Sequence, residues 1–158
     1  MILCVDLDDT LLKKDKSIST FTLKSLKRWK EELSVYFKFV PYINFVFVSA
    51  LTKKRINTLM PEIIKAYETN RKELKTSLLN DVITDAVSLH NPPSYKGKRL
   101  KIYFVSQTDK CPPKITFQVN SKKLVHFSYE RYLENKIREN FDLTGTPIIL
   151  QFKNKNEK

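Results

Sequence analysis

Short apolar segments alternate with segments of helical hydrophobic periodicity through the first 70 residues of the chain. The runs "ILCV" (residues 2–5) and "FVFVSAL" (residues 45–51) are apolar on both faces, as in strands buried in a parallel sheet. Residues 18–34 and 53–69 repeat apolar side chains at helical spacing, and Pro61 predicts a late start or a kink in the second helix. We therefore expect a β-α-β-α unit with two parallel strands and a right-handed crossover.

The remainder of the chain follows a different order. A helical stripe begins near Thr76 or Ser77, which we expect to act as its cap, and Ser128 is the expected cap of a second helix. "RLKIYFVSQ" (99–107), "ITFQV" (115–119) and "IILQF" (148–152) have the composition of strands. The order α-β-β-α-β predicts an α+β domain whose three-stranded sheet carries its helices on one face.

The charge balance points to a polyanionic partner. The 158 residues contain 29 Lys and Arg against 17 Asp and Glu, a net charge of +12. Fourteen basic and eight acidic residues lie in positions 1–72, so half of the excess belongs to each half of the chain. Such a surface favours RNA, DNA or an anionic membrane, and the alternative is a solvated lysine-rich surface with no bound target.

The scarcity of glycine excludes several nucleotide sites. Gly97 and Gly145 are the only glycines, and Gly97-Lys98 is followed by Arg99 rather than Ser or Thr. A P-loop needs glycines where its backbone approaches the phosphates, so this chain holds none, and GxGxxG and GxSxG motifs are excluded as well.

Nothing in the sequence suggests a membrane segment, a disulfide or a metal site. No apolar run approaches the length of a bilayer span. Cys4 and Cys111 stand alone, which favours a reduced, cytoplasmic setting with both thiols packed. The two histidines, His90 and His126, are too few for a metal site, and we expect them at helix ends or in packing. We expect no cofactor.

The second half resembles the C-terminal KH-like domain of the bacterial Der (EngA) GTPases. The resemblance is carried by "TSLLNDVITDAV", "NPPSYKGKRLKIYFVSQTDKCPPKITFQVN" and "HFSYERYLENKIRENFDLTGTPIILQF". Upstream, "YFKFVPYINFVFVSALTKKRINTLMPEI" is similar to the last strand and helix of that family's second G domain. The resemblance implies a truncated G-domain remnant (1–71), a KH-like domain (72–154) and a polar tail (155–158).

Der proteins carry two G domains before this module and act in assembly of the large ribosomal subunit. The resemblance implies a non-catalytic module that binds ribosomal RNA or the large subunit, without a membrane partner. Because two parallel strands that are apolar on both faces need neighbours, a separately encoded G-domain protein is a further expected partner. The alternative is a decayed or split GTPase fragment.

In such a fragment, residual guanine recognition would fall on four positions. The resemblance assigns them to Ser49, Ala50 and Leu51, which correspond to the base-contacting G5 element, and to Asp9, which takes the place of the guanine-reading aspartate. The lysine of the family's Asn-Lys-x-Asp motif is replaced by Leu7, which removes packing that shapes the loop. GTP is therefore not an expected ligand, although it stays an alternative.

The stretch "VDLDDTLL" also resembles the first motif of haloacid-dehalogenase phosphatases. That resemblance implies Asp6 as a nucleophile and Mg²⁺ ligand and Asp8 as a general acid/base, with Ser49 as a phosphate-binding hydroxyl. The chemistry also requires a lysine beside the phosphoaspartate and a second acidic pair, and Asp109 stands alone. We keep the phosphatase as an alternative to the binding module.

RNA contact has to be argued from charge, because a typical KH domain uses a GXXG loop and the two glycines are too far apart to form one. Residues 96–123 hold eight basic side chains and one acid, and one later helix adds two arginines. The predicted RNA-binding residues are Lys96, Lys98, Arg99, Lys101, Lys110, Lys114, Arg131 and Arg138.

Six aromatic residues in the same half are open to two interpretations. They are Tyr103, Phe104, Phe117, Phe127, Tyr129 and Tyr132. They are either platforms on which bases stack or core side chains, and their places on strands and on an inward helix face favour the core.

Overall fold

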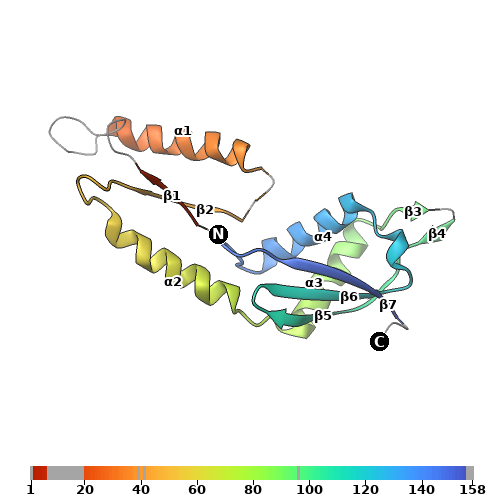
Figure 1. The fold of residues 1–158 in the computed structure, drawn as a ribbon. Helices are drawn as coiled ribbons and strands as arrows, with labels where there is room; N and C mark the ends of the chain where they lie inside the picture. The colour runs from red at the N-terminus through yellow and green to blue at the C-terminus, as the bar shows by residue number, and fades with distance from the viewer. Residues whose placement is uncertain (1, 7–19, 39, 41, 96, 156–158) are drawn as a thin grey trace. The chain divides into compact units, whose positions relative to one another are not determined.

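The computed structural model describes residues 2–6, 20–38, 40, 42–95 and 97–155, and the chain divides into two compact units. The first unit is Met1–Thr69 with Thr144–Thr146, and the second is Asn70–Leu143 with Pro147–Lys158. Figure 1 identifies their helices and strands by label and by colour along the chain.

The first unit is built on two parallel strands. Strand β1 (Ile2–Asp6) pairs with β2 (Asn44–Val48) in the register Ile2↔Asn44 to Asp6↔Val48, which confirms the predicted parallel pair. Helix α1 (Thr20–Tyr36) connects the two strands, and the 3-10 helix η1 (Ile56–Thr58) leads into α2 (Leu59–Asn70). Pro61 lies in the first turn of α2, where its missing N–H breaks no helical hydrogen bond, so the predicted late start is confirmed.

The core of this unit is small. Leu26 and Phe47 are its buried centre, and Val5, Leu33 and Phe45 pack against them. The apolar side chains of α2 contribute little to it, because Met60, Ile63, Ile64 and Tyr67 are all exposed.

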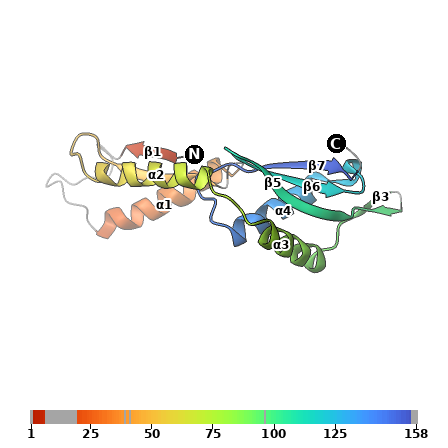
Figure 2. The ribbon, with the colours of Figure 1, turned by 90° about the horizontal axis from the view of Figure 1, so that it is seen from below.

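The second unit contains the three-stranded sheet that the sequence predicts. Strands β5 (Ile102–Lys110) and β6 (Pro113–Val119) are antiparallel, and β7 (Ile149–Asn154) lies parallel to β6, giving the order β5-β6-β7. Helices α3 (Thr76–Leu89) and α4 (Phe127–Asn140) lie on the same side of this sheet in Figure 2. The predicted α-β-β-α-β order and the one-sided cover are confirmed.

The core of the second unit lies between these helices and one face of the sheet. Phe117, Ile115, Val119, Leu79 and Leu133 are fully buried in it. Successive side chains of a strand point to opposite faces, so each strand sends every second residue into this core.

Two local features differ from the expectations. A small hairpin of β3 (Ser94–Tyr95) and β4 (Lys98–Arg99) precedes the sheet, and Gly97 turns it with a φ of 72°. Lys75, not Thr76 or Ser77, is the N-cap of α3, and it forms no side-chain cap hydrogen bond.

Helix α4 is capped by His126 rather than by Ser128. The His126 side chain accepts a hydrogen bond from the Ser128 N–H, at 3.3 Å, so the imidazole takes the role that we predicted for the serine. His90 is the C-cap of α3, and both histidines thus lie at helix ends as predicted. Cys4 and Cys111 are both exposed, so the prediction that their thiols are packed is wrong.

Candidate RNA interface

Three exposed cations follow one another where the chain enters the sheet. Lys98 and Arg99 form β4, and Lys101 lies just before β5. Asn120 holds this segment in place: its amide nitrogen donates to the Arg99 carbonyl at 2.9 Å, and its side-chain oxygen accepts from the Lys101 N–H at 2.9 Å. A third bond runs from the Asn120 N–H to the Lys101 carbonyl, at 3.0 Å. The backbone beneath these cations is therefore fixed by the strand that returns beside it.

More lysines are brought to the same place from two other segments. The Lys122 N–H donates to Asn154 Oδ1 at 2.9 Å, and the Lys155 N–H donates to the Val119 carbonyl at 3.0 Å. Ile102, Val119 and Asn154 are neighbours in the sheet register, so all these segments meet at one end of it. We call this the basic end; its exposed cations are Lys98, Arg99, Lys101, Lys122, Lys123 and Lys155.

Two of the predicted RNA-binding lysines lie at the opposite end of the sheet. Lys110 pairs with Glu73 (Nζ to Oε2, 3.2 Å), and Lys114 is half-buried opposite Asp109. Both lysines therefore have an acidic residue close by, unlike Lys98, Arg99 and Lys101, which take part in no ion pair among the residues that the structure describes.

The two arginines of α4 have different surroundings. Arg131 is exposed. The side chain of Arg138 is only 14% exposed; its Nε lies 2.9 Å from Glu134 Oε1, and its guanidinium also donates to the Leu143 carbonyl at 3.4 Å. These contacts hold the segment after α4 and direct the guanidinium away from solvent. Lys96 lies outside the described residues.

Three of the six aromatic residues are core residues and three are not. Phe117 and Tyr129 are buried, and Tyr132 is half-buried with its hydroxyl donating to the Ala86 carbonyl at 2.9 Å. The prediction of core packing is wrong for the rest, because Tyr103, Phe104 and Phe127 are 48%, 42% and 71% exposed. Strand position alone does not tell which face of a sheet is covered.

Burial has a chemical consequence for Tyr129. Its hydroxyl donates to the His90 carbonyl at 3.0 Å. Loss of hydration, and then the nearby Tyr132, raise the pKa of Tyr129 to about 12, because both disfavour the phenolate. Tyr129 and His90 also stack at a centroid distance of 6.5 Å, which joins the end of α3 to the start of α4.

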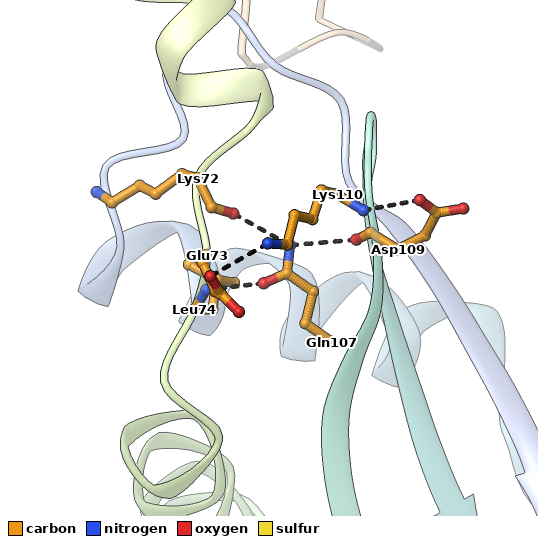
Figure 3. Close-up of polar contacts among 6 residues, drawn as sticks. All are labelled: Lys72, Glu73, Leu74, Gln107, Asp109 and Lys110. Atoms are coloured by element: carbon orange, nitrogen blue, oxygen red, sulfur yellow. Dashed lines mark hydrogen bonds and ion pairs between the residues drawn. The ribbon is translucent and has the colours of Figure 1, made fainter.

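The chain enters the second unit through a segment that is tied to β5 (Figure 3). The Gln107 amide nitrogen donates to the Lys72 carbonyl at 3.1 Å, and its oxygen accepts from the Leu74 N–H at 2.7 Å. The same nitrogen also donates to the Asp109 carbonyl at 3.1 Å. Residues 72–74 therefore behave as part of the second unit, held by one side chain and by the Lys110–Glu73 pair.

The predicted nucleotide-binding loop follows β2. Ser49 is buried; its hydroxyl is hydrogen-bonded to that of Thr52 and accepts from the Thr52 N–H at 3.1 Å. Ala50 and Leu51 are exposed, and Lys53 and Arg55 take left-handed backbone conformations as the loop turns. The loop is held by the contacts between Ser49 and Thr52. Asp9 lies outside the described residues, so its position relative to this loop stays a prediction.

The phosphatase motif begins at the end of β1, beside the end of β2. Asp6 ends β1 opposite Val48, so its backbone lies beside the strand that leads into Ser49. Asp8 lies outside the described residues. Within the described part of the chain, no three His, Cys, Asp or Glu side chains gather where they would hold a metal ion.

Comparison with known proteins now identifies the second unit. A family model described as the KH-domain-like region of EngA bacterial GTPase enzymes, C-terminal, matches residues 73–153. The chain belongs to this family. The match covers both helices of the second unit, its sheet up to residue 153 and five of the six cations of the basic end; Lys155 and the elements of the first unit lie outside it.

Similar proteins include several bacterial GTPases named Der. The chain is 44% identical over 135 residues to GTPase Der of Clostridium botulinum (strain Langeland), covering 85% of the chain and 31% of the relative. It is 46% identical over 130 residues to GTPase Der of Clostridium acetobutylicum, covering 82% and 30%. It is 46% identical over 127 residues to GTPase Der of Oceanobacillus iheyensis, covering 80% and 29%.

The chain thus spans about 30% of the length of these relatives. The alignment with the Clostridium botulinum protein is longer than the 81 residues of segment 73–153 by 54 positions, and only 5 residues follow position 153. At least 49 aligned residues therefore precede residue 73, so the similarity reaches into the first unit. Among the described residues, no helix is both long and apolar enough to cross a bilayer.

Proposed function

We propose that this chain is a non-catalytic module that binds ribosomal RNA through the basic end of its KH-like sheet, in connection with assembly of the large ribosomal subunit. The cytoplasm is the compartment in which this partner occurs. The proposal needs no cofactor and no metal.

The gathering of cations at the basic end carries this proposal. Lysines and arginines from three separate segments converge on one end of the sheet, and Asn120 holds the backbone of two of them, Arg99 and Lys101. Neutralisation of phosphates by such a group releases counterions and gives affinity that depends on salt and not on base sequence. Ribosomal RNA is the polyanion that the family membership favours, since the relatives are GTPases of the Der family.

The absence of catalysis is inferred from what the matched region contains. The family match covers the KH-like domain alone, and the sequence holds no P-loop. GTP hydrolysis depends on phosphates and Mg²⁺ that are positioned by such a loop. A binding role is therefore the function that the described residues support best.

We also propose that the first unit, residues 1–71, corresponds to the end of a G domain and is completed by a separately encoded G-domain protein. Two observations support this: the similarity to Der proteins reaches before residue 73, and α2 exposes Met60, Ile64 and Tyr67. Co-expression with the G-domain portion of a Der protein, followed by co-purification, tests this pairing.

The binding proposal is tested with the triple variant Lys98→Ala, Arg99→Ala, Lys101→Ala. We expect weaker binding to large-subunit ribosomal RNA and a salt slope (log K against log salt concentration) shallower by about 2 to 3, because three phosphate contacts are removed. The matched control is Lys27→Ala, Lys30→Ala, Lys38→Ala, which removes three exposed lysines from the first unit. Equal losses in the two variants would contradict a role for the basic end.

A further inference from the structure

One face of the sheet is left uncovered by α3 and α4. Val105, Phe117 and Phe152 are neighbours in the register and belong to the core. Because side chains alternate along a strand, the residues beside them point to the other face. Figure 2 shows both helices on one side of the sheet only. The open face is thus formed by side chains that the hydrophobic core does not use.

One row of this face lies next to the basic end. Phe104 pairs with Gln118, and Gln118 pairs with Lys153, so an aromatic ring, an amide and an ammonium group form a line across the three strands. Phe104 is 42% exposed, Gln118 is exposed and Lys153 is partly exposed. With strands about 4.8 Å apart, the backbones of Phe104 and Lys153 are separated by about 10 Å across the sheet.

The next row is polar and internally hydrogen-bonded. Thr116 pairs with Ser106 and Gln151 in the register, and its hydroxyl lies 2.9 Å from that of Thr108 and 3.4 Å from Gln151 Oε1. These contacts join the polar side chains of the row that lies beside Phe104. The acidic residue Asp109 lies at the far end of the face, opposite Lys114, in the second row beyond that of Phe104.

We propose that this open face is a platform for single-stranded RNA, on which one unpaired base stacks against Phe104 while Lys153 and the basic end hold the phosphates. This rests on the proposed RNA-binding function and adds a preference for single strands. An exposed ring on a sheet is a stacking surface for any base, because every base has a π-face, whereas paired bases of a duplex present no free face to it. Gln118 lies between the ring and the lysine, where its amide can donate to and accept from the edge of the stacked base.

The charge and the position of the row Phe104–Gln118–Lys153 favour single-stranded RNA over a protein as the bound partner. The row holds one lysine and no acid, and it follows directly on the register Ile102–Val119–Asn154 that forms the basic end. An RNA strand whose phosphates are bound at the basic end therefore passes Phe104 without leaving the cationic surface. The exposed rings at this place are Phe104 and the neighbouring Tyr103, over which the Lys155 ammonium group lies 4.9 Å from the ring centroid. Two rings among polar and cationic groups are too small an apolar patch for a stable protein interface.

The test measures the affinity of the full chain for a fluorescently labelled oligouridylate and for a duplex RNA of equal length, in Phe104→Ala and in the wild type. We expect Phe104→Ala to weaken binding of the single strand about 5- to 150-fold, the factor that corresponds to loss of stacking on one base. Binding of the duplex is expected to stay the same. Phe127→Ala removes a more exposed phenylalanine from α4 and is the matched control, for which no change is expected.

Two further variants distinguish a loss of RNA affinity caused by the missing ring from one caused by misfolding. Phe104→Leu keeps an apolar side chain but no ring and is expected to bind as weakly as Phe104→Ala. Phe104→Trp is expected to restore binding, with quenching of the tryptophan fluorescence on addition of the single strand. Unchanged affinity of Phe104→Ala, or equal losses for single strand and duplex, would overturn the platform while leaving the proposed RNA binding intact. Failure of the wild type to bind any RNA would instead refute the proposed function, and the platform with it.

Discussion

The side chain of Asn80 pairs with the backbone of Val105 as a neighbouring strand would. Its Oδ1 accepts from the Val105 N–H at 2.9 Å, and its Nδ2 donates to the Val105 carbonyl at 2.7 Å. Val105 lies in β5, at an edge of the sheet, where these two groups have no strand partner. Helix α3 thus covers the edge strand both with its apolar face and with one amide, and the sheet is protected from pairing with another chain.

Replacement of Asn80 by alanine is expected to destabilise the second unit by about 2–3 kcal/mol, because two partly buried backbone groups lose their partners. Urea denaturation followed by circular dichroism measures this change. Asn140→Ala is the matched control, since the Asn140 amide donates to one exposed helix carbonyl only, and its expected cost is below about 0.5 kcal/mol. Similar midpoints for the two variants would contradict the pairing role of Asn80.

The sequence predicted the elements of the second unit because their patterns are local. The stripe that contains Leu79, Ile83 and Ala86 can be read along the chain, and all three residues are buried as a single face of α3. The contacts of Asn80 and Gln107 could not be predicted, because they join segments 25 and 33 residues apart and depend on the spacing between a helix or linker and the edge strand. The caps were misassigned because the residue at which each helix begins depends on backbone angles as well as on residue type: α3 begins after Lys75 and α4 after His126.

Gln107→Ala is expected to release residues 72–74 from β5. In the wild type, limited proteolysis is expected to cut before Lys72 and to leave a stable fragment that begins there, because Gln107 holds the Lys72 carbonyl and the Leu74 N–H. In the variant, trypsin is expected to cut after Lys72 or Lys75 as well. Mass spectrometry of the fragments identifies the sites, and identical fragments from both proteins would show that Gln107 does not hold the segment.

The buried tyrosine predicts a loss of stability at high pH. The pKa of Tyr129 is about 12 in the folded state and about 10 in the unfolded chain, so its contribution is complete below pH 10 and is lost as the pH rises towards 12. The loss amounts to at most about 2.7 kcal/mol, two pKa units of differential proton binding. The Tyr129→Phe variant lacks this dependence, although it is about 1 kcal/mol less stable at pH 7 because the hydrogen bond to His90 is gone.

Urea denaturation of both proteins between pH 8 and pH 11.5 measures the difference in their free energies of unfolding. This difference is expected to shrink and then change sign as the pH rises. A difference that does not depend on pH would show that Tyr129 ionises equally in both states.

The two enzymatic alternatives are tested directly. We expect no Mg²⁺-dependent hydrolysis of a generic phosphomonoester, because the motif of Asp6 and Asp8 lacks the lysine and the acidic pair that the chemistry requires. We likewise expect no binding of GTP by calorimetry, since the chain has no P-loop. Hydrolysis that disappears in Asp6→Asn would establish the phosphatase, and magnesium-dependent binding of GTP would establish a working G domain.

The candidate interface could be predicted in part. The basic character of residues 96–123 is visible in the sequence, and the structure brings Lys98, Arg99 and Lys101 together with Lys122 and Lys123. The pairing of Arg138 with Glu134, one helical turn before it, could have been predicted from the sequence. The pairing of Lys110 with Glu73 could not, because the fold alone brings these two residues together. The exposure of Phe104 depends on which face of the sheet the helices cover, which the alternation of a strand leaves open.

The salt dependence of binding to large-subunit ribosomal RNA tests the central claim most directly. Six cations at the basic end predict that log K falls linearly with log salt concentration, with a slope of about −4 to −5 when all six contact phosphates. Fluorescence anisotropy of a labelled rRNA fragment, titrated with the full chain at several salt concentrations, gives this slope. An affinity that does not change with salt, or no binding at low salt, would contradict the account.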